Sequence, residues 1–158
     1  IALTGEMDLK NIGIISAYNS QVKLIKAKLA GFLSSELVDE MVATLDSFQG
    51  QERDLIIYSF TKSSSRAPKA RRIGFLNELR RLNVAMTRCI KTLVLIGDME
   101  FLSSCQHMDK DDDGEFIYER SEKQFSDFIT KMLGDVKGGR GEIMSYREFA
   151  KRMDGGSK

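Results

Sequence analysis

Two arginines seven residues apart are the first candidates for chemistry in this chain. Arg81 and Arg88 lie in a segment whose apolar residues recur with the period of an α-helix. On such a helix both guanidinium groups project from nearly one face, opposite Leu79, Leu82 and Met86. A planar guanidinium matches phosphate oxygens with paired hydrogen bonds, so the pair would suit a phosphate clamp. A solvated basic stripe is the alternative, and the spacing alone does not choose between the two.

The stretch SFQGQERD, residues 47 to 54, is the second candidate because it separates two runs of apolar residues. Glycine permits backbone conformations that other residues avoid, so the stretch predicts a sharp turn at Gly50 with the carboxylate of Glu52 beside it. An ordinary tight turn, and a surface acid that pairs with Arg53, are the alternatives at this point.

Four apolar runs predict the buried strands that position these residues: 11 to 17, 41 to 45, 54 to 61 and 92 to 98. Helical periodicity follows the first run, where Asn19 or Ser20 would cap the helix, and recurs at 75 to 90, 121 to 133 and 145 to 153. Alternating strands and helices indicate a parallel, doubly wound sheet flanked by helices. Ligands gather at the carboxyl ends of strands in such sheets, where the turns at Asn19, Ser47 and Gly97 would fall. We therefore expect one edge of the sheet to collect the candidates.

Composition places limits on the class of protein. The 158 residues, 42% of them hydrophobic, suffice for one core, and the net charge of +1 gives no global attraction to nucleic acid or membrane. The basic residues instead concentrate in the range 66 to 91, which holds eight of them against one acid. Two cysteines without CxxC spacing favour a reduced intracellular protein and disfavour a zinc site. No apolar run approaches the roughly 20 residues needed to cross a bilayer.

Three blocks of sequence, in order, carry a family resemblance: IGIISAYNSQ, VATLDSFQGQERDLIIYSFTKS and IGFLNELRRLNVAMTRCIKTLVLIGD. They resemble motifs IV, V and VI of superfamily 1 helicases, in the branch of nonsense-decay and senataxin-type enzymes, and cover residues 12 to 98. The resemblance implies an α/β RecA-like fold of the P-loop NTPase type. Residues 1 to 105 would form the second RecA-like domain of a two-domain motor, and 106 to 158 an acidic loop with a small helical C-terminal extension.

The resemblance also implies a role for each matched residue in the motor. Arg88 would be the arginine finger that reaches the γ-phosphate of ATP, with Arg81 supporting it. Gly50 would let the backbone approach the nucleotide closely, together with Gln49 and Glu52, whose family counterpart touches the ribose or couples the two sites. ATP and Mg²⁺ would be bound mainly by the first RecA-like domain of the same parent chain.

Single-stranded DNA or RNA is the partner that the resemblance implies. The residues that would hold its phosphates, without reading its sequence, are Ser16, Tyr18, Asn19, Thr44 and Ser47. Tyr18 could instead be plain packing, and the basic residues Arg71 and Arg72 would lie near the same ligand. We expect an intracellular protein, in the cytoplasm, with the nucleus as the alternative and no membrane association.

The chain lacks the GxxxxGK[ST] loop that cradles phosphates in such ATPases. We therefore expect it to be inactive alone, and its first residue, Ile1, suggests a processed or excised piece. The predicted function is the second motor domain of an ATP-dependent helicase or translocase. A non-catalytic nucleic-acid-binding or protein-docking module with a degenerate nucleotide fold is the alternative.

A calcium module is a rival interpretation of the acidic segment. Asp109, Asp111, Asp113 and Gly114 fit positions 1, 3, 5 and 6 of an EF-hand loop. The twelfth position, which needs a bidentate glutamate, is Arg120, whose charge would repel the ion. We therefore favour an acidic surface loop and predict no metal site.

Overall fold

The computed structural model describes residues 8–48, 50–61, 79–104, 109–110, 116–117 and 120–154. The elements, in chain order, are a 3-10 turn (Leu9–Asn11), β1 (Ile12–Ser16), α1 (Asn19–Leu29), α2 (Ser35–Met41), β2 (Val42–Thr44), β3 (Arg53–Ser59), α3 (Leu79–Met86), β4 (Cys89–Ile96), α4 (Met99–Ser104), β5 (Asp109–Lys110), β6 (Phe116–Ile117), α5 (Arg120–Asp135), a π-helical turn (Val136–Arg140) and α6 (Tyr146–Asp154).

The main sheet has the order β2-β1-β3-β4, and every pairing in it is parallel. Ser16, the last residue of β1, is level with Thr44 of β2 and with Ser59 of β3. Ser59 is in turn level with Ile96, the last residue of β4. The carboxyl ends of all four strands therefore lie along one edge, and the predicted parallel α/β fold is confirmed.

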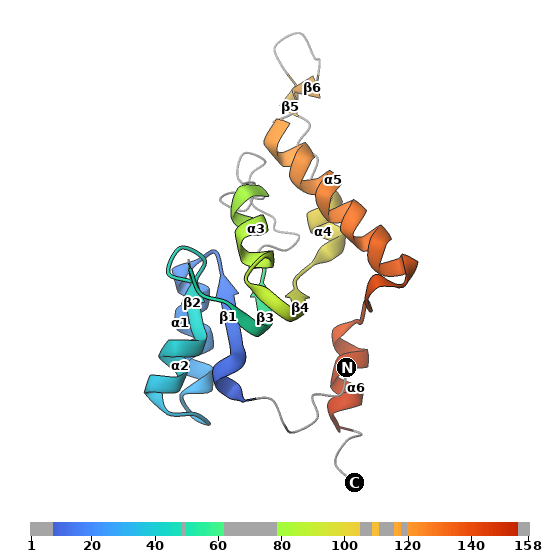
Figure 1. Cartoon of the computed structure of the whole chain (residues 1–158). Coiled ribbons are helices and arrows are strands. Elements are labelled where there is room, and N and C mark those ends of the chain that lie inside the picture. Colours follow the sequence, from blue (N-terminus) through green and yellow to red (C-terminus); the bar gives the residue numbers. More distant parts are fainter. Residues whose placement is uncertain are drawn as a thin grey trace.

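Helices cover both faces of this sheet because successive side chains of a strand point in opposite directions. Ile12 and Ile14 pack with α1 and α2, while Ile15 belongs to a core that also contains buried residues of α3, α4 and α5. Figure 1 shows α1 and α2 together beside β1 and β2, with α3, α4 and α5 gathered beyond the other strands. The result is a layer of helices, a sheet and a second layer of helices.

Helix α5 is part of the main core. Phe125 and Ile129 are fully buried in the cluster that contains Leu102 and Phe60, and the rings of Phe60 and Phe125 meet edge to face with centroids 6.5 Å apart. The hydroxyl of Ser126 donates to a carbonyl of α4. The helix predicted at 121 to 133 is thus confirmed and packs on the sheet, while the domain boundary that we predict at 105/106 stays a prediction.

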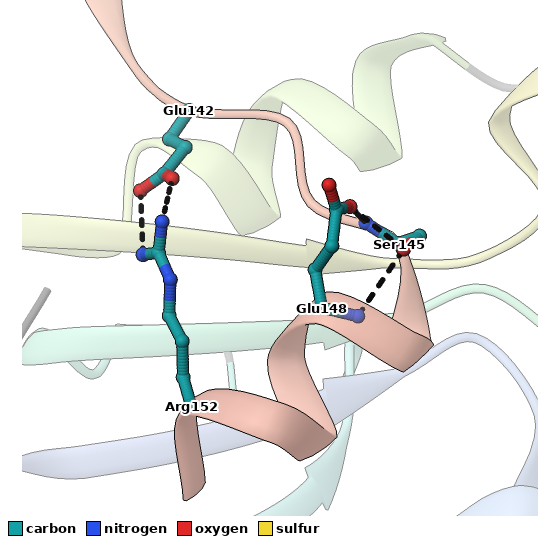
Figure 2. Close-up of polar contacts among 4 residues, drawn as sticks. All are labelled: Glu142, Ser145, Glu148 and Arg152. Carbon is teal, nitrogen blue, oxygen red and sulfur yellow. Dashed lines mark hydrogen bonds and ion pairs between the residues drawn. The ribbon is translucent and has the colours of Figure 1, made fainter. Parts of the chain in front are cut away.

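Helix α6 begins at a reciprocal cap (Figure 2). The Ser145 hydroxyl accepts a hydrogen bond from the Glu148 amide at 3.3 Å, and a Glu148 carboxylate oxygen accepts from the Ser145 amide at 2.8 Å and hydroxyl at 2.7 Å. Arg152 donates two bonds, of 3.1 and 2.5 Å, to the Glu142 carboxylate in the segment before the helix. These contacts explain why a short exposed helix forms where the periodicity predicts one.

Two helix boundaries differ from the prediction. The residue before α1 is Tyr18, in extended backbone and without a capping hydrogen bond from its side chain. Asn19 and Ser20 lie inside the first turn, so the prediction that one of them caps α1 is wrong, since a capping residue must directly precede the helix. Helix α3 ends at Met86 rather than near 90 because the chain enters β4 at Cys89.

Candidate functional site

The predicted glycine turn is present between β2 and β3. The amide of Gln51 donates to the carbonyl of Phe48 at 3.2 Å, and Gly50 has φ +82°. That value at the third position of a turn is typical of type II, which favours glycine. Gly50 is exposed, and a methyl group added there would meet nothing within 4 Å. The turn therefore offers open backbone to a ligand; Gln49 lies outside the described residues.

Phe48 fixes this turn to the sheet. The Phe48 side chain is fully buried, and its ring lies against the backbone of Gly13 in β1, where a Cβ would come within 2.6 Å of the ring. The chain leaves β2 at Thr44, at the carboxyl edge, and enters β3 at Arg53, at the opposite edge. The connecting segment must therefore cross the sheet face, and its residues Leu45 and Phe48 are buried in the main core.

Arg88 lies where the chain passes from α3 into β4. Its carbonyl accepts a hydrogen bond from the Arg53 amide at 3.0 Å, and Arg53 is level with Cys89 in the sheet. The side chain is half-buried, and its Nε donates to the Val84 carbonyl at 3.3 Å. Within the described part of the chain this is the one hydrogen bond of the guanidinium, and both terminal nitrogens are left for another partner.

Arg81 lies in α3, but its side chain is outside the described part of the structure. Its predicted pairing with Arg88 stays a prediction. Leu82 and Ala85 of the same helix are buried in the main core, with exposed fractions of 3% and 0%. The apolar face of α3 thus packs toward the sheet, as the periodicity predicts.

The candidates for nucleic-acid contact cluster at the carboxyl edge, where Thr44 Oγ1 and Ser47 Oγ are 2.8 Å apart. Ser47 and Asn19 are exposed, whereas Tyr18 is half-buried against the main core. Ser16 is fully buried, and its hydroxyl donates to the Ser59 carbonyl at 3.0 Å. That hydroxyl links β1 to β3 inside the sheet.

The expectation that one edge collects all the candidates is wrong for Gly50, Glu52 and Arg88. Parallel strands all begin at the same edge, so residues that directly precede β3 and β4 lie at the amino ends. The structure therefore separates the candidates into two groups. Gly50, Glu52 and Arg88 lie toward the amino edge, and the candidates for nucleic-acid contact follow the carboxyl ends of β1 and β2.

Arg53 enters the sequence prediction only as an ion-pair partner of Glu52. The Arg53 guanidinium instead donates to the Glu52 backbone carbonyl at 3.0 Å and to Gln51 Oε1 at 3.0 Å. The Glu52 carboxylate is exposed at the end of the turn. A cation at the first position of a buried strand is the signal that would have drawn attention to it.

The same described ranges contain neither a candidate metal site nor a candidate membrane span. No three His, Cys, Asp or Glu side chains among them gather as a metal site, and no helix there is long and apolar enough to span a bilayer. Asp111, Asp113 and Gly114 of the EF-hand alternative lie outside the described residues, as do Arg71 and Arg72.

Comparison with known proteins places the chain among helicases. The model of a family described as AAA domain matches residues 2–100. Over 95 residues the chain is 44% identical to the DNA polymerase alpha-associated DNA helicase A of Saccharomyces cerevisiae, covering 60% of the chain and 13% of the relative. It is 43% identical over 94 residues to Helicase sen1 of Schizosaccharomyces pombe, covering 59% and 5%. It is 43% identical over 95 residues to a Regulator of nonsense transcripts 1 homolog of Arabidopsis thaliana, covering 58% and 7%. The chain therefore spans a small part of the length of these relatives.

Proposed function

This chain belongs to the AAA domain family, in the nonsense-decay and Sen1 branch of superfamily 1 helicases, and from that premise we propose that it is the second motor domain of an ATP-dependent helicase. In this role it supplies the arginine finger and part of a track for single-stranded DNA or RNA. ATP and Mg²⁺ are held mainly by a first RecA-like domain, against which this domain closes.

The observation that carries the proposal is the junction of the Gly50 turn with Arg88. The hydrogen bond from the Arg53 amide to the Arg88 carbonyl joins the two segments at one edge of the sheet. Arg88 Nε donates to the Val84 carbonyl of the preceding helix, while its terminal nitrogens have no partner among the described residues. A half-buried stem with a free end is the form that a residue reaching across an interdomain cleft requires.

The residues at this edge fit a nucleoside triphosphate. The open space at Gly50 admits a ligand close to the backbone, and the exposed Glu52 carboxylate suits ribose hydroxyls. Bound there, the nucleotide supplies a phosphoryl group that is transferred to water, with negative charge developing on its oxygens. Arg88 contributes by placing its positive charge beside those oxygens, where a preorganised cation favours the transition state.

The proposed nucleic-acid track lies at the carboxyl edge. The hydroxyls of Thr44 and Ser47 are hydrogen-bonded to each other at 2.8 Å. Ser47 and Asn19 are exposed, so their side chains can donate to phosphate oxygens. Ser16 contributes from within, by fixing β1 to β3, rather than by contact with the ligand. Contacts of this kind bind the backbone of a strand and leave its base sequence unread.

ATP hydrolysis by a protein that joins this chain to the first motor domain tests the proposed arginine finger. Arg88→Ala is expected to lower kcat by about 10³ to 10⁵, the range for such residues. The control is Lys91→Ala, which removes an exposed cation near the same end of β4, paired with Asp54 at 2.8 Å. Undiminished turnover in Arg88→Ala would exclude the motor assignment of this residue.

Binding of labelled single strands to the same protein tests the track. The double variant Thr44→Val, Ser47→Ala is expected to weaken binding of unrelated sequences to the same extent, by about 2- to 10-fold per hydroxyl. Thr87→Val is the matched control, because this exposed hydroxyl, directly after α3 and at the other edge, donates to the Val84 carbonyl of that helix. Unchanged affinity, or a loss for one sequence only, would contradict the proposed track.

A further inference from the structure

We infer that Arg53 is a positioning residue that locks the Gly50 turn and the end of α3 into one unit. The inference rests on the proposed function for its consequence in catalysis, but the locking itself is a property of the fold. Arg53 touches no proposed ligand. Its side chain binds the turn, and its backbone amide is hydrogen-bonded to Arg88.

The side chain of Arg53 binds three parts of the turn segment. One terminal nitrogen donates to the Glu52 carbonyl at 3.0 Å, and the other donates to Gln51 Oε1 at 3.0 Å. The guanidinium carbon stands over the ring of Phe48, 5.4 Å from its centroid, which is within the range of a cation–π contact. The residues on both sides of Gly50 are therefore tied to one rigid planar group.

A fourth contact ties the same group to the helix before β2. Arg53 Nη2 lies 3.9 Å from a Glu40 carboxylate oxygen, and only 15% of the Arg53 side chain is exposed. Its Nε is buried and has no hydrogen-bond partner among the described residues. Holding a guanidinium in this partly desolvated position is unfavourable unless its remaining donors are well placed. Such a group is therefore held in one orientation.

The backbone of Arg53 makes the connection to the proposed arginine finger. Its amide donates to the Arg88 carbonyl at 3.0 Å, where Arg53 begins β3 and Arg88 directly precedes β4. The ladder shifts register between Arg53 and Leu55, so this bond stands apart from the regular pairing that follows. This hydrogen bond is a direct link by which a movement of the turn at Arg53 reaches Arg88.

Lysine cannot replace this arrangement. Its single ammonium group keeps the charge but lacks the planar fork that reaches the Glu52 carbonyl and Gln51 together. Arg53→Lys therefore separates the geometry of the guanidinium from its charge, and Arg53→Met removes both. Lys91→Met is the matched control, because it deletes the ion pair to the next residue, Asp54, without touching the turn.

Amide hydrogen exchange of this chain tests the locking directly. In Arg53→Met the amides of Gln51 and residue 53, bonded to Phe48 and Arg88, are expected to exchange at least about tenfold faster, because charged hydrogen bonds that hold the turn are lost. Arg53→Lys is expected to show a smaller increase, and Lys91→Met none. Amides of Ile56 and Tyr58 in β3 serve as an internal reference that should not change.

An unchanged Gln51 amide in Arg53→Lys would overturn the inference, and so would an equal acceleration in Lys91→Met. If Arg53→Met accelerates all amides because the whole chain is destabilised, Arg53→Lys decides the question. Exchange of the Gln51 amide and of the residue 53 amide is measured without any ligand. The test therefore applies whether or not the chain is part of a motor.

Kinetics of the two-domain protein separate this inference from the proposed function. A loosened turn must be ordered when the nucleotide binds, so Arg53→Lys is expected to raise KM for ATP, whereas Arg88→Ala lowers kcat. Faster exchange with unaltered kinetics would leave the locking in place and refute the proposed role of the turn. Unaltered exchange would refute the locking and leave the proposed function untouched.

Discussion

Gly13→Ala is the substitution whose effect the structure defines most closely. A Cβ at position 13 would lie 2.6 Å from Phe48 Cζ and 2.7 Å from Ile56 Cδ1, well inside contact distance. Both neighbours are fully buried, so neither side chain can swing into solvent. Gly13 itself does not have a positive φ, so alanine brings no backbone strain. The effect is therefore one of overpacking between β1 and the segment that carries the turn.

Overpacking of a well-packed core by one methyl group costs about 1 to 3 kcal/mol. For a protein of this size that corresponds to a fall in Tm of about 2 to 12 °C. Because Phe48 is displaced, the turn at Gly50 should also move. The amide of Gln51 is then expected to exchange faster than amides elsewhere, beyond the general loss of stability.

Thermal and urea unfolding followed by circular dichroism measure this loss. Gly134→Ala is the control: this exposed glycine of α5 has nothing within 4 Å of an added Cβ, and alanine there should raise stability by up to about 1 kcal/mol. Ile56→Val removes Cδ1 and costs about 0.5 to 1.5 kcal/mol alone. Combined with Gly13→Ala, it should cost less than the sum of the two single changes. A Gly13→Ala protein as stable as the parent would refute the packing argument.

Gly50→Ala and Gly139→Ala each place alanine at a positive φ, +82° and +98°, without a steric clash. Both variants should therefore lose about 1 to 2 kcal/mol of unfolding free energy in urea. Only Gly50→Ala should slow ATP hydrolysis in the two-domain protein, and equal kinetics of the two variants would contradict this. Phe125→Ala should lower the free energy of unfolding of the whole chain by about 3 to 5 kcal/mol, because the fully buried Phe125 ring belongs to the main core. A separate unfolding transition of α5, at lower temperature than the rest, would instead indicate an independent extension. Hydrogen bonds from the Ser145 hydroxyl and, to a smaller extent, from the Ser145 amide lower the pKa of Glu148 below 4.5. The cap therefore stabilises α6 above that pH, and its contribution is lost as pH falls through the lowered pKa. In an NMR titration of the Glu148 carboxylate, Ser145→Ala should raise the midpoint pH, and an unmoved midpoint would exclude the cap as the cause.

The strands and the glycine turn follow from local sequence. Runs of β-branched and other apolar residues around 12 to 16 and 53 to 59 form strands because both faces of the sheet are covered there, which leaves no polar alternation to obscure them. The run at 89 to 96 also forms a strand, although none of its residues is buried. Gly50 is predictable for a similar reason, since a positive φ selects glycine whatever surrounds it.

The edge on which each candidate lies was not predictable from motif order. Thr44 and Gly50 are six residues apart, yet they lie toward opposite edges because the segment between β2 and β3 crosses the sheet face. The burial of Phe48 against Gly13 accompanies that crossing, and both depend on residues distant in sequence.

The sequence by itself determined the parallel α/β architecture, the sharp turn at Gly50 and the family to which the chain belongs, since each depends on residue type and local period. Only the tertiary structure decided that Ser16 is internal, that α5 joins the core and that Arg53 holds the turn. The physical reason is the same in all three. A hydroxyl, an apolar helix face and a guanidinium each have several possible partners, and the partner is chosen by groups that only folding brings within contact distance.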